Sequence, residues 1–107
     1  MDYPVEFAAQ AVGEIDRIVA RIWQDAPLNA VRWREQLQEK IQQLTFRPDR
    51  FALAAESLDA PIAVRQIFFG KYRILYTIKE RTVFVLAVRH GHRLPMSLAE
   101  LRQRLKR

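Results

Sequence analysis

Residues 62–89 read Ile-Ala-Val-Arg-Gln-Ile-Phe-Phe-Gly-Lys-Tyr-Arg-Ile-Leu-Tyr-Thr-Ile-Lys-Glu-Arg-Thr-Val-Phe-Val-Leu-Ala-Val-Arg. β-Branched and aromatic residues dominate this stretch in three runs, and such runs predict strands. The runs fall at residues 62–69, 72–79 and 82–89. Gly70-Lys71 between the first two fits a type II′ hairpin turn, and only Glu80-Arg81 separates the second from the third. Connections this short make the three strands antiparallel neighbours.

Two amphipathic helices are predicted before these strands. Apolar residues recur at spacings of three and four over residues 8–25. A second apolar stripe begins after Pro27, a residue suited to a first helical turn. Pro48 ends the second helix because the residue before a proline avoids the helical conformation. The short connection between the helices predicts an antiparallel hairpin.

Shorter elements are predicted at the two ends of the chain. Residues 3–7 resemble a strand, and Ser97 with Glu100 forms a capping box that begins a short final helix. Residues 47–61 lack periodicity and are expected to form a loop. The order β-α-α-β-β-β-α predicts one α+β domain over residues 1–107, with the helical hairpin packed on one face of a mainly antiparallel sheet.

The net charge of +6 is unevenly distributed along the chain. Residues 1–53 carry seven basic and eight acidic side chains, whereas residues 54–107 carry eleven basic and four acidic ones. A one-sided positive field attracts phosphate or acidic partners. The alternative interpretation is a solvated, arginine-rich surface that serves solubility.

Strand alternation predicts where this surplus lies. If Tyr72 faces the helices, then Phe84, Leu86 and Val88 share its side of the sheet, and Val83 and Val85 point away. The uncovered face would then carry four basic residues: Arg65, Arg73, Lys79 and Arg89.

Several protein classes are excluded or disfavoured by composition. The absence of cysteine excludes disulfides, thiolate metal sites and a cysteine nucleophile. No apolar run approaches the roughly 20 residues of a membrane-spanning helix, and the first residues carry no secretion signal. His90 and His92 lack nearby carboxylates and make a poor metal site. We therefore expect a cytoplasmic protein without metal or cofactor.

Two segments resemble a known family. The piece Val64-Arg65-Gln66-Ile67-Phe68-Phe69-Gly70-Lys71-Tyr72-Arg73-Ile74-Leu75-Tyr76 and the ending Val88-Arg89-His90-Gly91-His92-Arg93 look like the RelE/ParE superfamily of toxins from type II toxin–antitoxin systems. The resemblance covers roughly residues 3–95. It implies the same α+β fold and a partner antitoxin with an acidic amphipathic tail.

The resemblance leaves two mechanisms open. RelE-like members cut messenger RNA on the ribosome with lysines and arginines around the phosphate, whereas ParE-like members typically poison DNA gyrase. At the positions of the paired RelE lysines this chain has Val64 and Gln66, and no tyrosine follows Tyr76. These departures favour the ParE branch, which acts by binding. A ribosome-dependent nuclease and a basic binding module without toxicity are the alternatives.

Two overlapping sets of residues are candidates for function. If the chain is a nuclease, cations and general acid–base groups are expected from Arg65, Arg73, Arg89, His90, His92 and Arg93. For binding the antitoxin or the target, we expect an apolar groove with basic flanks, formed by Leu75, Val85 and Ala87 with Arg65, Arg73, Lys79, Arg89 and Arg93. DNA would be reached only through the antitoxin, and no membrane is involved.

Overall fold

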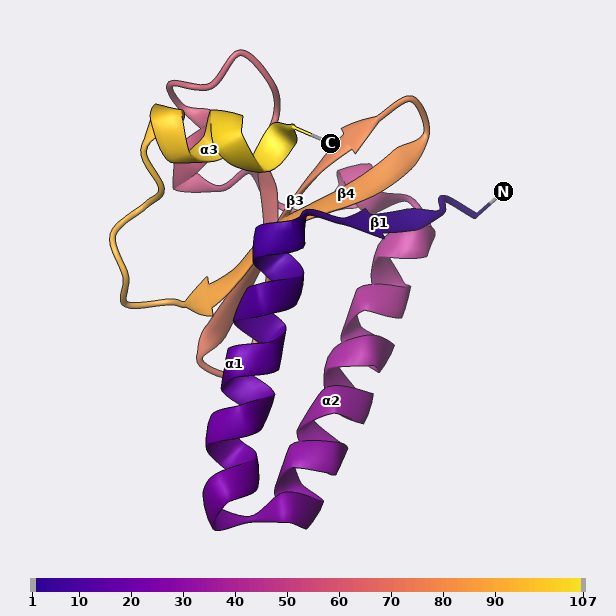
Figure 1. Cartoon of the computed structure of the whole chain (residues 1–107). Coiled ribbons are helices and arrows are strands. Elements are labelled where there is room, and N and C mark those ends of the chain that lie inside the picture. Colours follow the sequence, from indigo (N-terminus) through magenta and orange to yellow (C-terminus); the bar gives the residue numbers. More distant parts are fainter. Residues whose placement is uncertain (1, 107) are drawn as a thin grey trace.

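The computed structural model describes residues 2–106. It contains a helical hairpin, a sheet and a short last helix (Figure 1). The elements in chain order are β1 (Val5–Phe7), α1 (Ala9–Asp25), α2 (Pro27–Gln42), the 3₁₀ turns η1 (Gln43–Thr45), η2 (Pro48–Arg50) and η3 (Ala55–Ser57), β2 (Arg65–Phe69), β3 (Tyr72–Lys79), β4 (Thr82–His90) and α3 (Leu98–Leu105). The predicted α+β order is confirmed.

The four strands form one mixed sheet in the order β1-β4-β3-β2. β2, β3 and β4 pair antiparallel, as predicted, and β1 lies parallel to β4. β2 begins three residues later than predicted because the backbone of Val64 bonds to the preceding loop. Its N–H donates to Ser57 Oγ at 3.0 Å and its carbonyl accepts from the N–H of Ala54 at 2.8 Å.

Both hairpin turns use backbone with positive φ. Gly70 has φ 56°, as a type II′ turn requires at its first central position. The second turn has φ 52° at Glu80 and 62° at Arg81, so it adopts the left-handed conformation without glycine. The tight return of β4 along β3 follows from this turn.

The helical hairpin packs on the face of the sheet that carries Tyr72. Trp33 of α2 lies 5.6 Å from the Tyr72 ring and 5.4 Å from the Phe69 ring, measured between ring centroids. The predicted hairpin on one face is therefore confirmed, with Tyr72 on the helix side.

A β-bulge in β4 changes the predicted distribution of side chains. Leu75 pairs with Ala87 and Tyr76 pairs with Val85, so one extra residue, Leu86, stands in β4. Cross-strand partners share a face of the sheet. Val85 and Val83 therefore share the helix side with their partners Tyr76 and Ile78, and Phe84 lies on the opposite side with Thr77. The predicted sides of these three residues are wrong because an inserted residue reverses the alternation before it.

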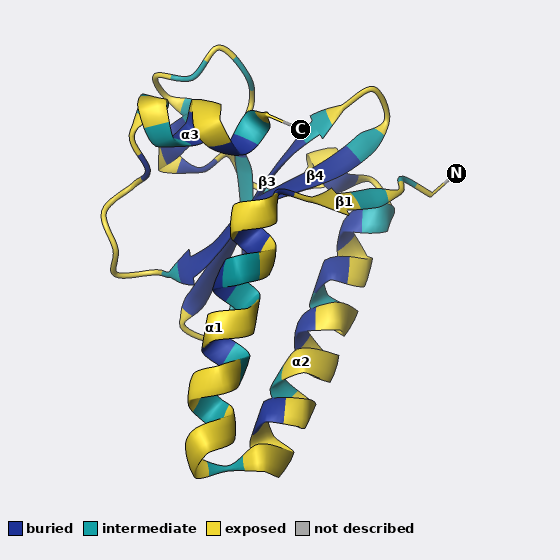
Figure 2. Ribbon diagram, in the orientation of Figure 1, coloured by how far each residue is buried: buried dark blue, intermediate teal, exposed yellow. Residues whose placement is uncertain are grey.

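The opposite face of the sheet is also covered by the chain. In β3 and β4 every residue from 72 to 77 and from 83 to 89 is buried, which alternation would forbid if one face met solvent (Figure 2). Met96 and Leu101 join the hydrophobic core from α3 and the segment before it. The expected uncovered basic face is therefore wrong, because the chain after β4 returns over it.

Within residues 2–106, no helix is both long enough and apolar enough to cross a membrane.

Tyr76 fastens the turn η2, which follows the helical hairpin, to the sheet. Its hydroxyl donates a hydrogen bond of 2.5 Å to the carbonyl oxygen of Pro48, and its side chain is fully buried. Burial raises the pKa of Tyr76 to about 12, with smaller effects from Arg65 and Arg50, which lower it.

Because the folded chain keeps this proton to higher pH than the unfolded chain, alkali should destabilise the fold. The unfolded phenol ionises near pH 10, so stability is fully present below that pH. It should then fall by up to about 1.4 kcal/mol per pH unit as pH rises toward 12. Urea unfolding of the wild type and Tyr76→Phe at several alkaline pH values tests this. If the free energy of unfolding falls with pH equally steeply in the two proteins, ionisation of Tyr76 is not the source of the alkaline destabilisation.

Candidate functional site

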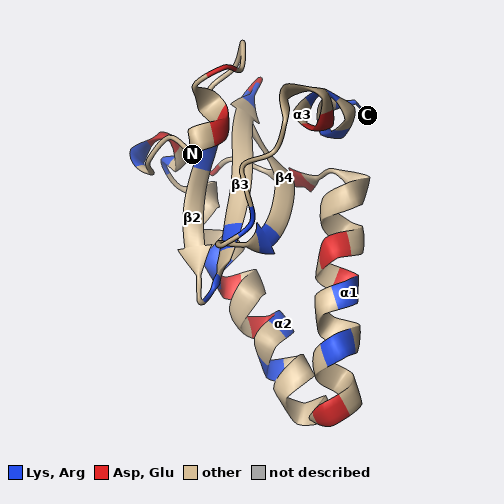
Figure 3. Cartoon of the chain, turned by 90° about the vertical axis from the view of Figure 1, so that its left-hand side faces the viewer, with Lys and Arg blue, Asp and Glu red and all other residues tan. Residues whose placement is uncertain are grey.

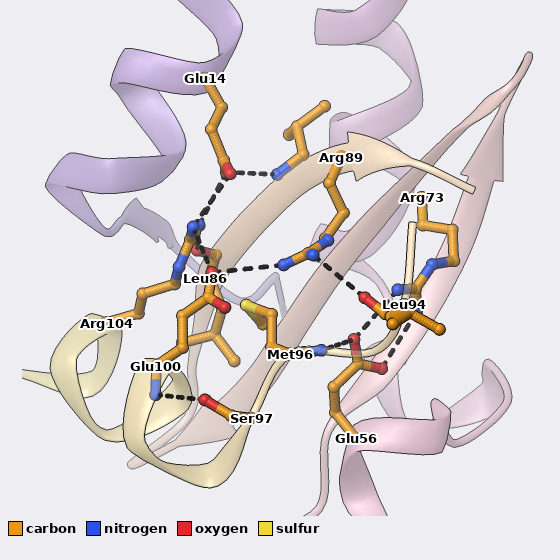
Figure 4. Close-up of polar contacts among 11 residues, drawn as sticks. Glu14, Glu56, Arg73, Leu86, Arg89, Leu94, Met96, Ser97, Glu100 and Arg104 are labelled. Carbon is orange, nitrogen blue, oxygen red and sulfur yellow. Dashed lines mark hydrogen bonds and ion pairs between the residues drawn. The ribbon is translucent and has the colours of Figure 1, made fainter. Parts of the chain in front are cut away.

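Arg73 of β3 lies in a buried ion pair on the covered face of the sheet. Its two terminal nitrogens each donate to one carboxylate oxygen of Glu56 at 3.0 Å (Figure 4). Nη1 also donates to Gln66 Oε1 at 3.0 Å. This bidentate geometry is the strongest form of arginine–carboxylate contact. The Arg73 guanidinium is therefore neutralised within the chain.

Glu56 also holds the segment that leads into α3. Its Oε2 accepts the backbone N–H of Met96 at 3.0 Å. Burial alone would raise the pKa of Glu56, but the hydrogen bonds from Arg73 and from the Met96 N–H outweigh it, so the pKa lies below its ordinary value. The carboxylate is thus charged and fully used in connecting η3, β3 and the segment before α3.

Arg89 of β4 stands directly opposite Arg73 in the strand register. It donates to Glu100 Oε2 at 3.3 Å and to the carbonyl oxygen of Leu94 at 3.1 Å, while its buried Nε has no hydrogen-bond partner among the described residues. Burial, and then the nearby Arg93 charge, lower the pKa of Arg89, although Glu100 opposes them. Arg89 is therefore only partly compensated.

A third arginine fastens α3 to α1. The terminal nitrogens of Arg104 donate to the two carboxylate oxygens of Glu14 at 2.7 and 3.0 Å, and Nη2 also reaches Glu100 at 3.0 Å. Burial alone would lower the pKa of Arg104, but the two glutamates raise it above its ordinary value. We refer to these six residues as the buried charge network: Glu14, Glu56, Arg73, Arg89, Glu100 and Arg104.

The network also closes the open edge of β4. β1 pairs with β4 only as far as Val85. Beyond that point Arg104 donates to the carbonyl oxygen of Leu86 at 3.1 Å, and Glu14 accepts the N–H of Val88 at 3.1 Å. Side chains of α1 and α3 thus replace a neighbouring strand along this edge, which would otherwise be open to pairing.

The structure does not form the predicted apolar groove as a surface. Leu75, Val85 and Ala87 are each 0% exposed, and the flanking Arg73 and Arg89 are buried in ion pairs. The chain returns over the face that carries Leu75, Ala87, Arg73 and Arg89, and Val85 lies on the helix side. All five residues are therefore part of the protein interior. The expectation that they form an accessible binding groove is wrong.

Two other predicted site residues lie apart from Arg73 and Arg89. Arg65 pairs with Tyr76, which places it on the helix side of the sheet, and its Nη1 donates to the carbonyl oxygen of Phe51 at 2.6 Å. Lys79 is exposed at the last position of β3. The predicted grouping of four basic residues on one face is therefore not observed.

The predicted site residues at the end of β4 and just after it, His90, His92 and Arg93, remain near the surface. His90 and His92 stack with ring centroids 4.9 Å apart, and the His92 N–H donates to His90 Nδ1 at 3.1 Å. Arg93 is exposed. Among residues 2–106, no three histidine or acidic side chains come close enough to hold a metal ion.

A pocket of about 320 Å³ lies between α1 and the end of β4. It combines two arginines that the sequence reasoning did not select, Arg17 and Arg21, with Arg89, His90 and Arg93. The spacing of four residues places Arg17 and Arg21 on the same side of a helix and was visible in the sequence. Their position beside β4 depends on how the hairpin crosses the sheet, which no local pattern records.

The comparisons with known proteins point to one family. A family model described as the ParE toxin of the type II toxin–antitoxin system parDE matches residues 5–95. No curated protein matches the chain. A solved structure described as the chromosomal ParDE TA system from P. aeruginosa has a similar fold, with a TM-score of 0.69 at 14% identity, and the match covers 82% of this chain and 95% of that one.

The Arg73–Glu56 pair gives a direct test of the buried charge network. Arg73→Gln should destabilise the fold by about 3–5 kcal/mol, because it leaves a buried carboxylate without its cation. The double variant Arg73→Gln/Glu56→Gln should be clearly more stable than Arg73→Gln alone, since no charge remains uncompensated. Urea unfolding of the four proteins in this cycle measures the coupling. Additive effects would show that the two side chains do not interact.

Proposed function

This chain belongs to the ParE toxin family of type II toxin–antitoxin systems, and from this membership we propose that it inhibits growth by binding DNA gyrase. It does so without chemistry of its own. A cognate antitoxin with an acidic tail neutralises it by binding. Both partners act in the cytoplasm, where we place the toxin.

Burial of Arg73 and Arg89 is the observation that supports binding over catalysis. Cleavage of RNA through a 2′-hydroxyl needs a general base, a general acid and cations that contact the phosphate. Arg73 and Arg89 are 6% and 5% exposed and face Glu56 and Glu100. Cations that are buried against carboxylates are poorly placed to receive a phosphate, so a nuclease mechanism has no support from this geometry.

A comparison of two assays tests the proposal. The purified chain should block supercoiling by gyrase, or trap cleaved DNA, and should leave translated messages uncut. The Arg73→Gln/Glu56→Gln variant keeps the buried pair neutral and should retain gyrase inhibition, provided that its thermal unfolding shows an intact fold. Messages cut at defined codon positions by the wild type but not by this variant would instead assign the chain to the ribonuclease branch.

A further inference from the structure

The pocket between α1 and the end of β4 is strongly basic. Its walls carry Arg17 and Arg21 from α1 and Arg89, His90 and Arg93 from the end of β4 and the following turn. Its remaining lining residues are apolar, apart from one carboxylate: Ile18, Tyr72 and Val88 with Glu14. A cation-lined pocket with apolar walls suits an anionic group carried on a partly apolar molecule.

Three of the four arginines of this pocket are not neutralised within the described chain. Arg17, Arg21 and Arg93 form no ion pair or hydrogen bond through their side chains in the part of the chain that the structure describes. Glu14 is already occupied by Arg104 and by the N–H of Val88. The pocket therefore keeps three uncompensated guanidinium groups.

The fourth arginine of the pocket, Arg89, is buried and only partly compensated. Arg89, which lines the pocket, is 5% exposed, and its Nε lacks a hydrogen-bond partner among the described residues. The Arg93 charge also acts on this guanidinium and lowers the pKa of Arg89. Anionic oxygen atoms in the pocket would offset this crowding of positive charge.

We propose that this pocket receives carboxylate side chains from an acidic segment of a protein partner. The inference rests on the proposed function, in which that partner is the antitoxin. Forked guanidinium groups bind carboxylates with two parallel hydrogen bonds. Three of them around one pocket would hold neighbouring acidic side chains, while Ile18 and Val88 contact the apolar part of the same segment.

The charge around the pocket favours a protein over a nucleic acid. Acidic and basic segments alternate along α1 (Figure 3). In the sequence Asp16 precedes Arg17 and Asp25 follows Arg21, so acidic positions lie on both sides of the basic ones. Nucleic-acid backbones need a basic surface that continues along many phosphates. A basic pocket with acidic neighbours instead suits discrete carboxylates at fixed spacing.

Recognition at this pocket should depend on side chains rather than on strand addition. The N–H of Val88 points away from β3, but Glu14 already accepts it. The carbonyl oxygen of Leu86 is likewise occupied by Arg104. An extended partner segment therefore finds the nearest part of the β4 edge closed, and the guanidinium groups supply the contacts.

Nuclear magnetic resonance of the arginine Nε–H groups can test the pocket without an identified antitoxin. A short synthetic peptide that alternates glutamate and valine should shift the signals of Arg17, Arg21, Arg89 and Arg93. A lysine–valine peptide of the same length should leave them unchanged. Absence of these shifts at millimolar peptide would overturn the proposal. So would a duplex DNA that shifts the same signals at lower concentration than the acidic peptide.

Charge reversal tests the same site with the co-expressed antitoxin. Arg17→Glu/Arg21→Glu should weaken the complex by at least about tenfold and flatten its dependence on salt. Arg32→Glu/Arg34→Glu is the matched control, because it makes the same charge change at exposed positions of α2 outside the pocket. The control should bind within about twofold of the wild type.

The outcomes separate this inference from the proposed function. Unchanged antitoxin affinity in Arg17→Glu/Arg21→Glu would overturn the proposal that the pocket binds the antitoxin. Equal losses of affinity in both double variants would overturn it as well. Retained gyrase inhibition in the pocket variant is expected, since the pocket binds the antitoxin. The wild type could fail to inhibit gyrase while the acidic peptide still binds at the pocket. That result would overturn the gyrase proposal and leave the proposal of a carboxylate-binding pocket intact.

Discussion

The structure depends on the neutralisation of two arginines that face each other across neighbouring strands. The register of β3 and β4 sets Arg73 directly opposite Arg89, and like charges in such a pair are destabilising. Glu56 and Glu100 each contact one of these guanidinium groups and reduce that repulsion. Only then can Met96 and Leu101 cover the sheet, because an unpaired charge beneath them would be too costly to bury.

The same interactions explain why so short a last helix is stable. α3 has eight residues, fewer than an isolated helix needs in water. It gains a side-chain cap, since the N–H of Glu100 donates to Ser97 Oγ at 3.1 Å, and a bidentate ion pair from Arg104 to Glu14. That ion pair joins residues 90 positions apart in the chain. The position of α3 is therefore set by long-range electrostatic contacts and apolar packing more than by local preference.

The periodic elements could be predicted from sequence, whereas the environment of the charges could not. Runs of β-branched residues and the amphipathic stripes gave the strands and helices, because these patterns record which side of an element is buried. The bulge at Leu86 needs no special residue, so nothing in the sequence announced the reversal of alternation at Val85. Glu56 lies in a 3₁₀ turn, and its contact with Arg73 became visible only in three dimensions. The surplus of positive charge can be counted from the sequence, but its predicted place on an uncovered face of the sheet was wrong.

This arrangement limits what the covered face can do. To expose Arg73 and Arg89, the chain would have to separate the pairs with Glu56 and Glu100 and remove Met96 and Leu101 from the core. Re-exposing these two apolar side chains would cost about 1.5–3 kcal/mol each, and a domain of this size is stable by only about 5–15 kcal/mol. Opening the face would thus consume a large part of the free energy of folding. Contact with other molecules is left to cations that are already accessible, and those of α1 and of the turn after β4 meet at one pocket.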